Sequence, residues 1–314
     1  MKGLELAEKY YNEFGVKMIK DEFPDLEGVL AVGLFGSGSD CYGYDDEVSH
    51  DHDFEPGFKI LLPSESVIDS KTEFKLERAY AKLPKEFMGF KRGFVDAVGG
   101  NRYGVIRTAD FFSEKVGDGK GDLSLTAWLK IPSFYLAEAT NGKIFRDDLG
   151  EVTEIRRKLS AMPKDILNKR LAGNLLTMAQ SGQYNYYRLI KHGEYEASEL
   201  SLVEFVKSAL QVLYLLNGKY APFYKWAFRG LKDLDFGADM YDDLSSLLFG
   251  DNRNEETADG KLFTVECVAE KIIDELKNRS MTSAVCGDLE KHAYSVNDKI
   301  TDGYIRNLDI FSGV

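Results

Sequence analysis

The stretch GLFGSGSDCYGYDDEVSHDHDF, residues 33–54, decides how this chain is interpreted. It places glycines, serines and carboxylates between two apolar runs, GVLAVGLFG at 28–36 and HDFEPGFKILL at 52–62. Short apolar runs bounded by glycine are typical of buried strands. A connection rich in glycine and serine lets backbone amides and short hydroxyls come close to a phosphate. The stretch therefore predicts two strands joined by a segment that binds phosphate and metal.

Four residues directly after the first predicted strand are the candidate phosphate ligands. We expect Gly36 to let the backbone turn sharply, and Ser37 to offer its hydroxyl and amide to a phosphate oxygen. Gly38 and Ser39 extend the same surface. A solvated loop is the alternative for a glycine–serine sequence. The strand, the turn and the spacing to the next acids together favour the phosphate site.

Asp51 and Asp53 are the candidate metal ligands and catalytic residues. In a strand, residues two apart point to the same face and lie about 6.6 Å apart. The two carboxylates are therefore expected to converge on Mg²⁺ or Mn²⁺, because these ions prefer oxygen ligands. Two such ions can stabilise the attacking and leaving oxygens of a group transfer. His50 and His52 have zinc binding as an alternative, but a hydrogen bond that anchors the strand is favoured.

Other acids in the stretch have a simpler interpretation. Asp45, Asp46 and Glu47 are expected to be loop acids, or charges at the N-terminus of a helix where they suit the helix dipole. Cys41 has no basic neighbour in the sequence, so it is not expected to act as a nucleophile. Calcium binding is not favoured, because the glycine and glutamate of an EF-hand loop do not follow.

Gly36-Ser37, about a dozen residues and then Asp51-His52-Asp53 resembles the nucleotidyltransferase superfamily, the fold of DNA polymerase beta and aminoglycoside nucleotidyltransferases. The longer GYDDEVSHDHDFEPGF is similar to the signature of the nucleotidyltransferase-like DUF4037 family. TAWLKIP, LAEATNGKIFRDDLGE and LNGKYAPFYKWAFRGL extend this resemblance over most of the chain. The resemblance implies transfer of a nucleoside monophosphate from a metal-bound nucleoside triphosphate to a hydroxyl. The acceptor stays open between a small molecule, a protein side chain and an RNA end.

One feature departs from the superfamily pattern. Active members carry a third carboxylate on a later strand, whereas the strand predicted here, YGVIRT at 103–108, has none. Asp96 and Asp110 are the nearest acids. Two alternatives therefore remain: a catalytically impaired nucleotide-binding or regulatory module, and an interaction protein of the toxin–antitoxin type.

The chain predicts an α+β fold with two domains. Residues 1–150 are expected to form a nucleotidyltransferase-like mixed β-sheet with flanking helices, and residues 151–314 an all-α bundle. Apolar residues recur with the 3.6-residue period of a helix in the second part. The predicted helices there cover 164–191, 200–217, 222–234 and 261–279, with a polar loop at 250–261.

YAPFYKWAFRGL, residues 220–231, is the informative piece of the second domain. Pro222 is expected at the first helical position. Lys225 and Arg229 are four residues apart, so they share a helix face and become candidate contacts to a triphosphate or another acidic substrate. A surface pair beside a core stripe is the alternative. The tyrosines of QYNYYRLI, 183–190, are expected to be packing residues rather than part of a cleft.

The composition restricts the class of partner. The formal net charge is −12, whereas proteins that follow a nucleic-acid backbone usually carry a basic footprint, so long nucleic acid is not expected. Three scattered cysteines predict neither a disulfide framework nor a zinc site. No apolar run approaches the ~20 residues of a membrane span, and the N-terminus is not a signal peptide. We expect a cytoplasmic protein; its oligomeric state is not predicted.

Overall fold

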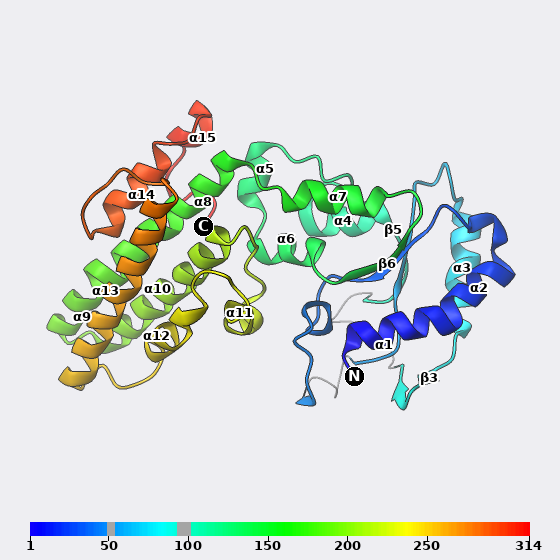
Figure 1. Cartoon of the computed structure of the whole chain (residues 1–314), viewed down its shortest axis with the longest axis horizontal. Coiled ribbons are helices and arrows are strands. Elements are labelled where there is room, and N and C mark those ends of the chain that lie inside the picture. The colour runs from blue at the N-terminus through cyan, green and yellow to red at the C-terminus, as the bar shows by residue number, and fades with distance from the viewer. Residues whose placement is uncertain (49–53, 93–101) are drawn as a thin grey trace. The chain divides into compact units, whose positions relative to one another are not determined.

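The computed structural model describes residues 1–48, 54–92 and 102–314. The chain forms two compact units (Figure 1). The first is Met1–Leu123 together with Phe134–Ala161, and the second is Ser124–Ser133 together with Met162–Val314. The α+β class is confirmed. The predicted boundary at 150 assigns residues 151–160 to the second domain, whereas this helix belongs to the first compact unit because it packs beside the last strand of the sheet.

The first unit contains the sheets and the helices around them. Its elements are α1 (Gly3–Tyr10), η1 (Tyr11–Gly15), α2 (Val16–Glu22), η2 (Pro24–Leu26), β1 (Ala31–Leu34), η3 (Asp40–Tyr42), β2 (Lys59–Leu62), α3 (Ser70–Lys82), β3 (Glu86–Phe87), β4 (Phe90–Lys91), β5 (Gly104–Arg107), α4 (Thr108–Val116), α6 (Ser133–Thr140), β6 (Lys143–Asp147) and α7 (Glu151–Ser160).

The second unit is helical in the part that the structure describes. Its elements are α5 (Leu125–Lys130), α8 (Lys164–Met178), η5 (Ala179–Tyr186), α9 (Tyr187–His192), α10 (Tyr195–Leu216), α11 (Tyr224–Leu231), η6 (Ala238–Met240), α12 (Tyr241–Ser246), α13 (Glu255–Asn278), α14 (Leu289–Asn297) and α15 (Gly303–Asn307).

The main sheet of the first unit is mixed, with strand order β5-β2-β1-β6. β1 pairs antiparallel with β2, where Val32 lies opposite Ile60, and antiparallel with β6 on its other edge. β2 pairs parallel with β5. All four residues of β1 are buried, because the strand is central and its two faces are covered. The strand therefore delivers residues 35–39 to a fixed place at the end of the sheet.

One face of this sheet is covered by the N-terminal helices and α3. Tyr10, Ile19 and Leu76 are fully buried there together with Val32 and Ile60 of the strands. Phe58 packs against the rings of Tyr10 and Tyr80 in this core. α1, η1 and α2 form one continuous helical segment, which ends at Glu22, just before Pro24. α3 begins at a side-chain cap on Asp69 and ends before Pro84.

The second unit is built around the long helical segment α8–η5–α9, which packs against α10 and α14. Within it, η5 is a π-helical stretch, where the helix widens by one residue per turn. Gly182 lies in this stretch, and an added Cβ there would be 2.3 Å from Phe205 Cδ2. The missing side chain of Gly182 thus lets α10 approach closely. Leu202, Leu213 and Val265 lie in the core that results.

Several predicted boundaries are wrong for identifiable reasons. Beyond residue 53, the second predicted strand begins only at Lys59, because the Pro56-Gly57 pair interrupts extended pairing. The predicted loop at 250–261 gives way to helix at Glu255, since the Asn254 side chain accepts a hydrogen bond from Thr257 N and caps α13.

Two further elements differ from expectation. α11 begins at Tyr224, so Pro222 precedes the helix instead of opening it. β6, Lys143–Asp147, was not among the predicted strands, although it pairs along the whole of β1.

Candidate functional site

The glycine–serine turn, residues 35–39, begins where β1 ends. Phe35 is fully buried and packs edge-on against Phe111, with ring centroids 5.0 Å apart. The backbone then enters the left-handed region twice, at Gly36 (φ 111°) and at Gly38 (φ 119°). Only glycine takes such values without strain. Glycine at positions 36 and 38 is therefore required by the path of the chain.

Asn141 holds this turn from the segment just before β6. Its Oδ1 accepts a hydrogen bond from Gly36 N, and its Nδ2 donates to Gly36 O, each at 2.8 Å. One side-chain amide thus satisfies both polar groups of Gly36. The next residue, Gly142, has φ 66°, and an added Cβ would lie 2.2 Å from Leu34 O. The two segments are so close that only glycine fits between them.

Arg156 of α7 fixes the segment that carries Asn141. Its Nη2 donates to Asn141 O at 2.5 Å and also to Thr140 O. The guanidinium lies over the Phe35 ring, 5.3 Å from the centroid. Burial lowers the pKa of Arg156, but a guanidinium stays protonated in a protein. A positive charge is therefore held directly beside the start of the turn.

Arg102 and Asp40 form an ion pair at the other end of the turn. Arg102 Nε also donates to Ser37 O at 3.1 Å, and Asp40 Oδ1 accepts from Cys41 N at 2.9 Å. The two side chains are only 10% and 5% exposed. An added Cβ at Gly38 would lie 2.1 Å from Arg102 Nη2. The pair thus packs tightly against the turn and fixes its backbone.

Lys59 is a buried lysine in an otherwise apolar strand. It is 4% exposed, and its Nζ donates to Phe35 O at 3.1 Å and to Arg102 O. Burial lowers its pKa to about 8, because a low-dielectric site disfavours the charged amine. Among the residues that the structure describes, no carboxylate forms a salt bridge with it. At pH 7 the amine is therefore charged and lies next to the turn.

The turn keeps several hydrogen-bond donors available. Ser37, Gly38 and Ser39 are partly exposed. Within the described ranges, neither their backbone N–H groups nor the two serine hydroxyls have an acceptor. Successive amides of this kind form anion-binding nests in proteins. The Gly36 amide is different, because it is already bonded to Asn141, so Gly36 shapes the turn and does not donate to a ligand.

Asp45 acts as a charge at a helix N-terminus, which confirms one of its two predicted roles. Its Oδ2 accepts a hydrogen bond from the backbone of Gly3, the first residue of α1, at 2.9 Å. Its Oδ1 lies 4.0 Å from Lys2 Nζ. Cys41 is buried, and its pKa is raised to about 12 by burial and then by the Asp40 carboxylate. A thiol of this kind is unreactive, as the sequence predicts.

The predicted metal ligands belong to the part of the chain that the structure does not describe. Outside the described residues lie Asp51, Asp53, His50, His52 and Asp96. Convergence of the two aspartates on a cation stays a prediction. In residues 1–48, 54–92 and 102–314, no group of three His, Cys, Asp or Glu side chains is placed to hold a metal ion.

No third carboxylate lies on β5, Gly104–Arg107. β5 lies beside β2 in the sheet, and its four residues, GVIR, include no acid. Asp110, which is near it in sequence, is exposed in the first turn of α4. Asp110 is therefore not a side chain of the strand.

Lys225 and Arg229 lie on α11, in the second compact unit. Both side chains are exposed, and both lie over the ring of Trp226, at 5.5 and 5.7 Å from its centroid. The shared ring confirms that they occupy one face of the helix. The turn with Ser37 belongs to the first unit, so a common site stays a prediction.

Sequence reasoning missed most residues that hold the turn. Asn141 and Arg156 are distant in sequence, and nothing in an Asn-Gly pair distinguishes a clamp from an ordinary turn. Lys59 carried a usable signal, because a lysine inside the apolar run GFKILL must find buried acceptors. Arg102 is the second residue after a glycine pair and carries no signal of its own.

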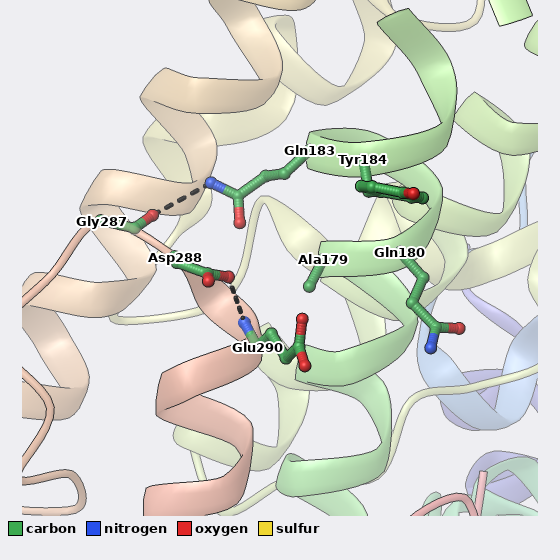
Figure 2. Close-up of a pocket in the computed structure, with 7 residues that line it drawn as sticks. All are labelled: Ala179, Gln180, Gln183, Tyr184, Gly287, Asp288 and Glu290. Carbon is green, nitrogen blue, oxygen red and sulfur yellow. Dashed lines mark hydrogen bonds between the residues drawn. The ribbon is translucent and has the colours of Figure 1, made fainter. Parts of the chain in front are cut away.

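A separate pocket of about 460 Å³ lies in the second unit, between η5 and the start of α14 (Figure 2). Its lining residues are Ala179, Gln180, Gln183, Tyr184, Gly287, Asp288 and Glu290. Gln183 accepts a hydrogen bond from Leu289 N and donates to Gly287 O, so it caps α14. Tyr184 is 58% exposed beside this pocket, whereas Tyr186 is buried, so the prediction of packing holds for only some of these tyrosines.

A family model described as "Domain of unknown function (DUF4037)" matches residues 128–227, about a third of the chain. The match includes Asn141, Arg156 and Lys225, and it excludes the glycine–serine turn. No curated protein matches the chain. Among the helices that the structure describes, none has the length and hydropathy of a membrane span.

Proposed function

We propose that this protein is a nucleotidyltransferase. It would transfer a nucleoside monophosphate from a nucleoside triphosphate to a hydroxyl group of an acceptor. The new bond joins the acceptor oxygen to the α-phosphorus, the bond from the α-phosphorus to its bridging oxygen breaks, and pyrophosphate leaves. The hydroxyl proton passes to solvent water in the same reaction.

The observation that carries the proposal is the glycine–serine turn with its free donors. Three successive backbone amides and two hydroxyls, on Ser37, Gly38 and Ser39, have no acceptor among the described residues. The positive charges of Lys59 and Arg156 lie at Phe35, where the turn begins. Donors fixed in advance, next to buried positive charge, favour a polyphosphate over water.

The residues divide into three roles. Ser37 and Ser39, with the amides of the turn, bind the β- and γ-phosphates. Asp51 and Asp53 supply oxygen donors of the kind that Mg²⁺ or Mn²⁺ prefers, and the bound cation would stabilise negative charge on the transferring phosphate. Lys225 and Arg229 are the proposed contacts to the triphosphate or acceptor.

The arrangement of the sheet supports the nucleotidyltransferase-like fold. The turn follows a central strand, and the segment with Asp51 and Asp53 leads into β2, the antiparallel neighbour of that strand. The absence of an acid on β5 supports a second candidate, a nucleotide-binding module without catalysis. Both candidates share the phosphate site and differ in whether label is transferred.

The direct test uses the four nucleoside triphosphates labelled at the α-phosphate, with Mg²⁺ or Mn²⁺ and a set of hydroxyl acceptors. Transfer of label and release of pyrophosphate are the expected results. Asp51→Asn combined with Asp53→Asn should abolish both. Asp21→Asn, on α2, is the matched control, since it removes an exposed carboxylate from the same unit.

A binding measurement separates the alternatives. Nucleotide should raise the melting temperature of the wild type by mass action, and Ser37→Ala should reduce this shift. Ser113→Ala, on an exposed position of α4, serves as its control. Binding without label transfer would favour the regulatory module. Absence of binding would reject both nucleotide proposals and leave the toxin–antitoxin type of interaction protein.

A further inference from the structure

Asn141 makes the most specific contact to the turn. Its amide group pairs with the N–H and the C=O of the same residue, Gly36, at 2.8 Å each. A side chain that satisfies both groups fixes the orientation of the peptide planes on either side of that residue. Gly36 has φ 111°. Without a Cβ, glycine could adopt other backbone conformations of similar energy at this position. The clamp therefore selects one backbone conformation out of several.

The conformation selected by Asn141 decides where the next amides point. Ser37 N–H belongs to the peptide unit whose carbonyl is Gly36 O, the acceptor of Asn141 Nδ2. The peptide is planar, so fixing the direction of this carbonyl fixes the opposite direction of the Ser37 N–H. The Asn141 side chain thus orients the first free donor of the turn without contacting a ligand.

Asn141 is itself fixed by Arg156. The guanidinium donates to the carbonyl oxygens of Thr140 and Asn141, and it rests on the Phe35 ring. Gly142 then allows the chain to pass within van der Waals contact of Leu34. The chain of contacts runs from α7 through residues 140–142 to Gly36. Asn141 and Arg156 both belong to the segment matched by the family model, whereas Gly36 does not.

We propose that Asn141 is a positioning residue for phosphate binding and that Arg156 holds Asn141 in place. Asn141 holds the Gly36 peptide so that the amides and hydroxyls of Ser37–Ser39 face the triphosphate. This inference rests on the proposed nucleotide site. It adds that the family-matched segment contributes to that site by orienting the turn.

The test uses two substitutions that separate the two hydrogen bonds. Asn141→Ala removes both. Asn141→Asp keeps an acceptor for Gly36 N but loses the donor to Gly36 O. Hydrogen exchange of the Gly36 amide should become fast in Asn141→Ala and stay slow in Asn141→Asp. Exchange in β2 should be unchanged in both variants, which would show that the unit is still folded.

The second readout is binding of magnesium tripolyphosphate, a probe without a base, by calorimetry. Loss of two hydrogen bonds that orient the site should weaken binding by about tenfold or more in Asn141→Ala. Arg156→Ala should weaken it in the same direction, and Arg156→Lys should recover part of the loss. Arg157→Ala, in an exposed pair on the same helix, is the control and should bind like the wild type.

The possible results separate the existence of the Asn141 clamp, its role in binding and the proposed nucleotide site. Slow Gly36 exchange in Asn141→Ala would show that the clamp does not exist. Fast exchange with wild-type affinity would show a clamp that plays no part in binding. If the wild type binds neither tripolyphosphate nor any nucleoside triphosphate, the proposed function itself fails and the positioning role fails with it.

Discussion

The buried Lys59 predicts an unusual dependence of stability on pH. Its pKa is lowered from 10.5 to about 8 in the folded chain, because burial disfavours the charged amine. Between these two values the unfolded chain binds one proton more than the folded chain, so the free energy of unfolding rises with pH. At about 1.36 kcal/mol per pKa unit, the full gain is about 3 kcal/mol.

The perturbation is Lys59→Met, which keeps an unbranched side chain one heavy atom shorter and removes the titrating group. At neutral pH two effects oppose each other. The cost of burying a charge disappears, but Phe35 O and Arg102 O lose their donor, at about 1–3 kcal/mol for each buried acceptor. The test is therefore the slope and not the absolute stability. The free energy of unfolding of the wild type should rise relative to that of the variant as the pH rises from 8 towards 10.

The assay must report on the first unit alone. Both tryptophans, Trp128 and Trp226, belong to the second unit, so their fluorescence does not serve. Cys41 is 2% exposed in the first unit, and a thiol reagent reaches it only after unfolding. Labelling of Cys41 by a short pulse, measured by mass spectrometry across a urea series, gives the unfolded fraction at each pH.

Lys75→Met is the matched control, because it removes an exposed lysine from α3 in the same unit. Subtracting each variant's curve from that of the wild type cancels the titration of other groups, such as tyrosines whose pKa is raised by burial. A difference curve for Lys59→Met that stays flat between pH 8 and 10, or that falls, would refute the assignment of a buried and charged amine.

Three further predictions concern the turn and its surroundings. Gly38→Ala should destabilise the first unit by about 2 kcal/mol or more, since φ is 119° and the new Cβ would meet Arg102. Gly43→Ala, where φ is 71° and the Cβ would meet open space, should cost about 1 kcal/mol. Equal costs for the two substitutions would contradict the packing argument. Asp40→Asn breaks a nearly buried ion pair and should lower the free energy of unfolding by about 3–5 kcal/mol in the same urea assay. Asp122→Asn, in an exposed pair with Lys158, should change the free energy of unfolding by only about 0–1 kcal/mol. In the native protein at pH 8, iodoacetamide should modify the exposed Cys286 and leave the buried Cys41 intact. The reason is that burial raises the pKa of Cys41 to about 12. Rapid modification of Cys41 would show that the segment after the turn opens readily.

The elements that sequence reasoning found are those with a local signal. β1 is a continuous apolar run, and the alternating glycine and serine after it indicate a turn. α10 repeats apolar residues with helical period. In each case the cause of the structure lies within the segment, so one sequence is sufficient to predict it.

The elements that it missed depend on partners elsewhere in the chain. β6 reads KIFRD, a short and mostly polar run that becomes a strand because β1 offers it an edge. Asn141 becomes a clamp only because β6 pairs with β1 and brings the preceding residues to Gly36. Tertiary pairing of this kind is not written into local propensity. The same pairing explains why the candidate site includes residues more than a hundred positions apart.

The buried Lys59 and the half-buried Arg156 would explain how a chain with a net charge of −12 holds the proposed polyanion at this turn. Surface charges are screened by salt over about 8–10 Å, whereas a charge in the interior is screened much less. Lys59 and Arg156 are held by backbone carbonyls, which solvate a cation without neutralising it. The cost of burying these charges is thus present in the free protein. An anion at the amides of Ser37–Ser39 would offset part of that cost, so the local potential, and not the net charge, sets the preference of the turn.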